Sequence, residues 1–203
     1  MAITILVGYT HTYMVMLLEN KLSFDLLTDV LSVPTLIELG KHASVSDTDI
    51  SSYDIWPTEV TEDDQAPECF THNLTGKIRS MVLHDIFMND QLPCYKQSWV
   101  KNADVAIQKI PHQGFITRHI DTCEFSLTVF LNTVHHGGHF VWADEQNNEH
   151  YIKPVFNSGV YAYYETAIQG AQHEVLPVRS KQCRSTLQLF VFDKTKDSSV
   201  KPV

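Results

Sequence analysis

Short apolar runs separated by turn residues fill the second half of this chain. From residue 98 onward the runs are rich in Val, Ile, Phe, Tyr and Trp, a composition typical of β-strands. They cover 99–100, 105–107, 125–131, 140–142, 151–152, 160–164, 174–176 and 187–192. Turn residues separate them at 132–133, 137–138, 145–148 and 157–159. Many short strands without intervening helices predict a sandwich or barrel, such as a double-sheet jelly roll.

Helical patterns occur in the first half of the chain instead. Residues 22–32 place apolar side chains at helical spacing, with Ser23 as an N-cap and Pro34 closing the helix. Residues 76–92 predict a second helix, which Pro93 would end. We therefore expect a mainly β fold in which supporting α-helices cover one face of a sheet.

The length of 203 residues predicts a single domain, 1–203. Residues 1–97 would supply supporting helices, strands and an acidic loop, and residues 98–195 the β-rich core that carries the candidate chemistry. The acidic loop lies between Lys41 and Lys77, where eight Asp or Glu residues and no Lys or Arg occur. This pattern is typical of a solvated surface loop, and a lid that attracts a basic substrate is the alternative.

Charge and cysteine usage exclude several classes of protein. The net charge of −9 argues against broad, charge-driven binding of nucleic acid. The four cysteines form no C-x-x-C pair, which argues against a zinc knuckle or a thioredoxin-like motif. The N-terminus lacks the basic segment of a signal peptide, and polar residues interrupt its apolar stretch before a membrane span is reached. We expect a cytoplasmic protein with reduced thiols and no contact with membranes.

A candidate metal site combines His119 and Asp121 with a remote His173. Residues two apart on a strand share a face, so His119 and Asp121 can reach one ion. His173 follows Asp121 by 52 residues, enough for several strands of an antiparallel roll to return it beside the first pair. Two imidazoles and one carboxylate bind non-heme Fe(II) and leave positions open for substrate and oxygen.

A candidate anion site follows at Arg184 and Thr186. If residues 179–182 form the turn of a hairpin, its register pairs His173 with Gln188 and places Arg184 and Thr186 on the same face. The guanidinium fork suits a carboxylate. A dicarboxylate could then chelate the metal at one end and meet Arg184 and Thr186 at the other.

Eleven histidines make chance matches a concern, and a lone H-x-D has little weight. The segment His135-His136-Gly137-Gly138-His139 is dense in imidazole, but it contains a glycine turn and has no matching carboxylate. We interpret it as a loop. The ordered combination of both candidate sites in a β-rich context is the stronger signal.

The stretch from about Gln108 to Asp193 resembles the 2-oxoglutarate- and Fe(II)-dependent oxygenases, within them the prolyl-hydroxylase-like group. The segments that carry the resemblance are 114–121 with its H-x-D, 126–132 ending in Leu-Asn, 137–140 with its glycine pair, 173–178 and 184–187. It implies a double-stranded β-helix, a jelly-roll variant. It also implies that His119, Asp121 and His173 bind Fe(II), and that Arg184 and Thr186 bind 2-oxoglutarate.

The chain departs from the family pattern at two tyrosines. Family members often have a tyrosine about ten residues before the H-x-D, where this chain has Lys109-Ile110-Pro111. The strand tyrosine before Leu-Asn is Phe130 here, which lacks a hydroxyl. Lys109 is a candidate for replacing one of the lost hydrogen bonds.

The resemblance implies hydroxylation of a substrate, with a prolyl residue of a protein or peptide as the leading candidate, coupled to conversion of 2-oxoglutarate to succinate. Fe(II), 2-oxoglutarate and O₂ would be required, with ascorbate as a further candidate cofactor. One alternative is hydroxylation of a free amino acid or small metabolite. Another is a non-catalytic module that binds iron and 2-oxoglutarate. The acidic charge disfavours a nucleic-acid demethylase.

Overall fold

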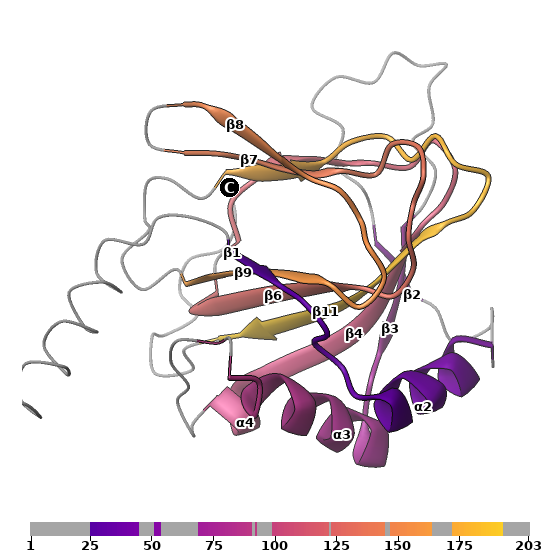
Figure 1. The fold of residues 1–203 in the computed structure, drawn as a ribbon, viewed down its shortest axis with the longest axis vertical. Coiled ribbons are helices and arrows are strands. Elements are labelled where there is room, and N and C mark those ends of the chain that lie inside the picture. The colour runs from indigo at the N-terminus through magenta and orange to yellow at the C-terminus, as the bar shows by residue number, and fades with distance from the viewer. Residues whose placement is uncertain are drawn as a thin grey trace, which may run out of the picture.

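The computed structural model describes residues 25–44, 51–53, 69–90, 92, 99–121, 123–144, 147–163 and 172–192. In these parts of the chain, a seven-stranded and a four-stranded antiparallel sheet face each other (Figure 1). The prediction of a mainly β fold with supporting helices and a two-sheet jelly-roll core is confirmed.

The larger sheet has the strand order β1-β9-β6-β11-β4-β3-β2. Its strands are β1 (Asp25–Leu27), β9 (Gly159–Tyr163), β6 (Phe125–Phe130), β11 (Arg184–Val191), β4 (Ala103–Ile110), β3 (Cys69–Asn73) and β2 (Ser51–Tyr53). β11 is the central strand of this order and pairs with β4 along its whole length and with β6 from Thr186 onward. Its position in the sheet is therefore fixed on both edges.

The smaller sheet has the order β5-β10-β7-β8. Its strands are β5 (Ile116–His119), β10 (His173–Val175), β7 (Phe140–Ala143) and β8 (Glu149–Ile152). The pairing places His173 opposite His119 on one side and opposite Trp142 on the other. Three strands that are distant in sequence thus bring these side chains into one row.

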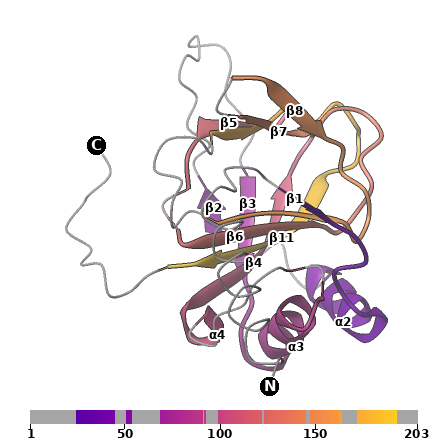
Figure 2. The ribbon, with the colours of Figure 1, turned by 60° about the vertical axis from the view of Figure 1, so that its left-hand side comes forward.

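Helices cover the outer face of the larger sheet, on the side away from the smaller sheet (Figures 1 and 2). They are α2 (Val33–Ser44), α3 (Gly76–Phe87) and α4 (Trp99–Asn102). The core beneath them includes buried residues of α3 and, on β11, Leu187, Leu189 and Val191. Because strand side chains alternate between faces, Arg184, Thr186 and Gln188 of β11 face the smaller sheet.

Two predictions of local structure are wrong. Asp25–Leu27 is a strand that pairs with β9, and the helix begins at Val33 and not near Ser23. Pro34 lies in the first turn of α2 because a proline there gives up only an N–H that has no partner within the helix. The predicted strand at 99–100 is the short helix α4. The second predicted helix is observed as α3, but it ends at Phe87 and does not extend to residue 92.

The predicted hairpin between His173 and Arg184 is also wrong. β10 belongs to the smaller sheet and β11 to the larger one, and Gln188 pairs with Ala106 and Thr128, not with His173. The segment that connects them, residues 176–183, crosses between the sheets. Its backbone is hydrogen-bonded to the glycine loop (residues 135–139), where Gly138 N donates to Pro177 O (3.1 Å). A crossing segment and a hairpin have the same local sequence pattern, so periodicity alone cannot separate them.

Most of the predicted acidic loop, residues 54–68, lies outside the described residues. Among the helices of the described ranges, none combines the length and the apolar character needed to cross a membrane.

Gly137 provides a test of the crossing segment. It has φ +73°, and a Cβ placed on it would lie 2.1 Å from the carbonyl oxygen of Pro177 and 2.7 Å from the backbone nitrogen of Arg179. We expect Gly137→Ala to lower the free energy of unfolding by roughly 2 kcal/mol or more, because backbone atoms must move and the conformation is strained. Denaturant unfolding measures this.

The matched control is Gly40→Ala on α2, where a Cβ would meet nothing within 4 Å. Since alanine is the better helix former, this change should be neutral or stabilise by up to about 1 kcal/mol. An equal loss in both variants would contradict the close approach at Gly137.

Candidate metal centre

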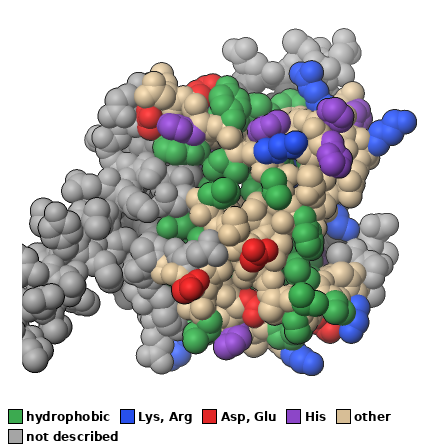
Figure 3. Space-filling view, in the orientation of Figure 1, with side chains coloured by type: hydrophobic (Ala, Val, Ile, Leu, Met, Phe, Trp, Pro, Cys, Tyr) green, Lys and Arg blue, Asp and Glu red, His purple; other side chains and the backbone are tan. Residues whose placement is uncertain are grey.

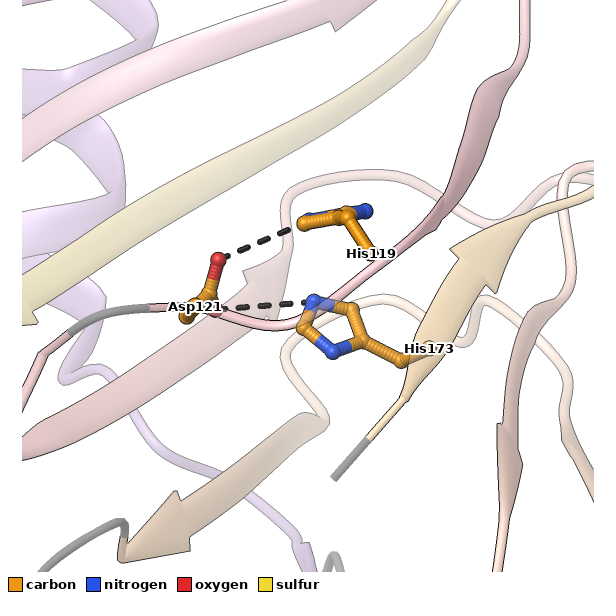
Figure 4. Close-up of side chains that lie close together, drawn as sticks. All are labelled: His119, Asp121 and His173. Carbon is orange, nitrogen blue, oxygen red and sulfur yellow. Dashed lines mark ion pairs between the residues drawn. The ribbon is translucent and has the colours of Figure 1, made fainter. Parts of the chain in front are cut away.

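Three potential metal ligands meet at one end of the smaller sheet (Figure 4). His119 is the last residue of β5, Asp121 lies two residues beyond it, and His173 opens β10. One candidate donor atom from each residue lies within 4.8 Å of the other two. Asp121 lies between the imidazoles, with carboxylate oxygens 3.5 Å from Nε2 of His119 and 3.5 Å from Nε2 of His173. Sequence reasoning had predicted this grouping, and the structure brings all three together.

The two imidazoles differ in their surroundings. Their ring centroids are 4.3 Å apart, and Phe140 of β7 stacks on His173 at 5.1 Å. The His173 side chain is 7% exposed, whereas that of His119 is 38% exposed. The group is therefore sealed on the Phe140 side and open to solvent on the His119 side.

A hydrogen bond fixes the orientation of His119. Its Nδ1 lies 2.7 Å from the carbonyl oxygen of Thr117, and a carbonyl can only accept, so Nδ1 carries the hydrogen. This leaves Nε2, which faces Asp121, as the ligand atom. Burial disfavours the protonated ring, but the hydrogen bonds to Asp121 and Thr117 outweigh it, so the pKa of His119 lies above its ordinary 6.5. A metal ion would compete with that proton, since ligation needs the neutral ring.

Charged side chains on the outer face of the smaller sheet hold the ligand strands together. Arg118 precedes His119, and its Nε donates to Oε1 of Glu174, the residue after His173 (3.0 Å). The same guanidinium donates to Oε1 of Glu149 on β8 (2.5 Å). The Arg118 cluster (Arg118, Glu174, Glu149) therefore ties β5 to β10 and β8. Each pair is partly exposed and contributes little to stability, but the cluster restricts the spacing of the two histidines.

Arg118→Ala should weaken metal binding without unfolding the protein. Removing the pairs lets β5 and β10 move relative to each other, and losing an outer partner of a ligand typically weakens metal affinity about tenfold or more. Metal titration followed by a spectroscopic or calorimetric signal measures the change, and high salt should reproduce part of it in the unaltered protein.

The control is Lys41→Ala, which removes the exposed Lys41–Glu38 pair (3.0 Å) on α2. Metal affinity should stay unchanged in this variant. A loss of the same size in both variants would show that the Arg118 cluster has no special effect on the metal ligands.

Arg184 and Thr186 lie on the facing sheet. Arg184 opens β11, is 0% exposed, and places its guanidinium carbon 5.1 Å from the ring centroid of Phe130. The glycine loop packs closely on it, since a Cβ on Gly138 would lie 3.2 Å from its Cδ. A guanidinium in such dry surroundings interacts strongly with a carboxylate and can bind it through two parallel hydrogen bonds. Thr186 is fully buried two residues further along β11.

Apolar residues connect the two ends of the site. Phe130, beneath Arg184, belongs to one buried cluster with Phe140, which stacks on His173. Ile110, which pairs with Arg184, packs in another cluster with Val175 of β10. The candidate metal ligands and the guanidinium therefore face the same space between the sheets.

Sequence reasoning missed the polar residues Gln108 and Gln188 on the inner face of the larger sheet. Gln108 pairs with Thr186, so it lies on the same face as that residue. Lys109 pairs with Ser185 and lies on the opposite face, where it cannot replace a hydrogen bond near Arg184. Period-two alternation could have identified Gln108 only if the register of β4 against β11 had been known.

Other histidines also lie near the smaller sheet, and Figure 3 shows several histidines in the upper part of the view, where that sheet lies. His135 and His136 are exposed and belong to the glycine loop, as the sequence predicted. The His136 carbonyl accepts a hydrogen bond from Arg179 N (3.0 Å). These residues support the crossing segment through their backbone, and among the described residues the metal-ligand grouping found is His119, Asp121 and His173.

Comparison with known families agrees with this geometry. Residues 105–192 match the family model described as the 2OG-Fe(II) oxygenase superfamily. The matched region contains both ends of the site, and that superfamily's use of Fe(II), 2-oxoglutarate and O₂ agrees with the side chains found there. No curated protein sequence gives a significant match.

Solved structures share the fold over most of the chain. A prolyl-4-hydroxylase from Pseudomonas putida is 16% identical with a TM-score of 0.60, covering 89% of this chain and 100% of that one. A Trichoplax adhaerens prolyl hydroxylase, solved with a peptide fragment of the hypoxia inducible factor oxygen degradation domain, is 16% identical with a TM-score of 0.64 and 98% coverage of both chains. An oxidoreductase of the 2OG-Fe(II) oxygenase family from Burkholderia pseudomallei is 13% identical with a TM-score of 0.62, covering 91% and 93%.

Proposed function

We propose that this chain is a dioxygenase in which His119, Asp121 and His173 hold a catalytic Fe(II). The observation that carries the proposal is the convergence of these three ligands on one point that faces a buried arginine across the two sheets. Two imidazoles and one carboxylate are the donor set that suits non-heme Fe(II) and leaves coordination positions open. The stacking of Phe140 on His173 and the hydrogen bond from His119 to Thr117 would hold these ligands in place before the metal binds.

Arg184 and Thr186 would bind the distal carboxylate of 2-oxoglutarate. Their burial would keep water from competing for that carboxylate. The buried cluster that contains Phe130 and Phe140 would pack against the cosubstrate between Arg184 and the metal ligands. With both groups bound, iron and 2-oxoglutarate supply the oxidising chemistry: one atom of O₂ enters succinate and the other enters the substrate, with release of CO₂. The protein contributes binding, orientation and exclusion of water.

We propose a prolyl residue in a protein or peptide as the substrate. The side chain of His119 is 38% exposed, so a segment of a polypeptide can approach the metal ligands directly from solvent. Two structural neighbours are prolyl hydroxylases, and one of them was solved with a peptide. A free amino acid or small metabolite is the second candidate. The complete ligand set together with Arg184 disfavours a non-catalytic module.

The proposal extends to the organisation of the chain. Residues 1–97 would form one domain with the core at 98–195, because α3 and β3 pack directly on strands of that core. The thiols of Cys123 and Cys183 are free, which suits a reducing, cytoplasmic setting that also preserves Fe(II).

The deciding experiment measures succinate formed from 2-oxoglutarate by the purified protein with Fe(II) under air, with and without a library of proline-containing peptides. We expect iron-dependent succinate that rises with the right peptide, together with a peptide mass gain of one oxygen atom. Asp121→Ala should lower both by at least about a hundredfold, because it removes the carboxylate ligand. Iron-dependent succinate without any change in the peptides would favour the small-molecule alternative.

The matched control is Asp144→Asn, which alters the His150–Asp144 pair (3.0 Å), a similar imidazole–carboxylate contact beside the same sheet. Activity should persist in this variant. Absence of iron binding in the unaltered protein would refute the proposal.

Arg184→Lys tests the proposed binding of the distal carboxylate of 2-oxoglutarate. Lysine keeps the positive charge but loses the planar fork, so the 2-oxoglutarate concentration for half-maximal activity should rise about tenfold or more. Iron affinity should be retained because Arg184 is on the other sheet. An unchanged requirement would mean that another cation, such as the exposed Arg179 or Lys181, binds the carboxylate.

A further inference from the structure

Four uncharged polar side chains form a connected group on the inner face of the larger sheet. This inner polar group consists of Gln108 on β4, Thr128 on β6, and Thr186 and Gln188 on β11. Thr128, Thr186 and Gln188 are each at most 8% exposed. Buried polar side chains are costly unless hydrogen-bonded, so the bonds within this group determine how each member is oriented.

Gln188 is held at both ends of its amide. Its Oε1 accepts from the hydroxyl of Thr128 (2.7 Å). Its Nε2 donates to Oγ1 of Thr186 (3.0 Å) and to Oε1 of Gln108 (3.3 Å). Thr128 lies on β6 and Gln108 on β4, so the amide links the two strands that flank β11. These contacts fix which end of the amide faces Thr186.

The bond from Gln188 determines what the Thr186 hydroxyl can do. The hydroxyl accepts a hydrogen from the amide, so its own hydrogen must point elsewhere. In this structure it points to the backbone carbonyl of Gln108, at 3.5 Å, the far limit of a hydrogen bond. A closer, charged acceptor would displace that weak bond.

Such an acceptor is expected beside Arg184. Residues two apart on a strand share a face and lie about 6.7 Å apart along it, a span that one carboxylate can bridge. Phe130, which pairs with Thr186 on the neighbouring strand, offers no hydroxyl for this purpose. Thr186 is thus the side chain on this part of β11 that can add a neutral donor to the guanidinium.

We infer that Gln188 is a positioning residue for the cosubstrate: it directs the Thr186 hydroxyl toward the distal carboxylate of 2-oxoglutarate bound at Arg184. This inference rests on the proposed function. It also explains why position 188 carries an amide: a carboxylate would keep the contact with Thr128 but would remove the donor to Thr186. It would also place a negative charge beside Thr186, where the cosubstrate's own carboxylate should bind.

The test is anaerobic equilibrium binding to the Fe(II)-loaded protein, with two ligands. One is 2-oxoglutarate, and the other is 2-oxovalerate, which has the same chain length but lacks the distal carboxylate. Thr186→Val and Gln188→Met should each weaken 2-oxoglutarate binding about fivefold to tenfold, the range expected for one hydrogen bond. Binding of 2-oxovalerate and of Fe(II) should not change.

The double variant Thr186→Val with Gln188→Met distinguishes positioning from simple support of the fold. If Gln188 acts through Thr186, the double variant binds 2-oxoglutarate no more weakly than Thr186→Val alone. Gln188→Glu should bind it more weakly than Gln188→Met because of the added charge. Thr186→Ser, which keeps the hydroxyl, should bind it nearly as well as the unaltered protein.

Independent, additive losses would overturn the inference, as would equal losses for 2-oxovalerate or Fe(II), which indicate general damage. Thermal unfolding identifies a variant that does not fold, in which case the isosteric Gln188→Glu and Thr186→Ser comparison decides alone. If the unaltered Fe(II)-loaded protein does not bind 2-oxoglutarate at all, the proposed function itself is refuted. If 2-oxoglutarate binds, but the losses of the two single variants simply add in the double variant, only the role of Gln188 is refuted.

Discussion

The structure depends on the two-residue alternation of β11, a central strand hydrogen-bonded on both edges. Leu187, Leu189 and Val191 pack against the helix-covered core, whereas Arg184 and Thr186 face the smaller sheet. A register shift of one residue would point the Arg184 guanidinium into the apolar core, where burying a charge among apolar side chains would destabilise the fold. The same burial that stabilises the sheet therefore holds Arg184 and Thr186, the proposed anion-binding side chains, in place.

The candidate metal ligands of the smaller sheet are positioned differently, by strand pairing. Its strands are short, and His173 owes its position to pairing with β5 on one side and β7 on the other. An irregularity in the β5–β10 register follows His173, a feature that often re-aims side chains next to active sites. The resulting site has a solvent-open end at His119 and a dry end at Arg184. That asymmetry fits a small dicarboxylate held inside and a large substrate approaching from outside.

The departures from the family pattern have a physical counterpart in this chain. Where relatives often use tyrosine hydroxyls, Phe130 supplies only an aromatic face beneath the guanidinium. Hydrogen-bonding capacity occurs instead in the inner polar group, whose members are neutral amides and hydroxyls. Because these members carry no charge, they add hydrogen-bonding capacity near Arg184 without adding a negative charge that would repel an anionic ligand.

Local periodicity and residue chemistry were enough to predict several features of this protein. Runs such as 125–131 identified strands, two-residue spacing placed Arg184 and Thr186 on one face, and the donor types of His119 and Asp121 indicated a metal. These features depend on neighbours in sequence, so the sequence alone determined them. Three others depend on partners far away in the chain. The strand Asp25–Leu27 pairs with β9, and β10 and β11 lie in different sheets. Gln108, not Lys109, faces the site. Only the tertiary structure decided these, because strand register and sheet membership are set by long-range pairing that no local pattern records.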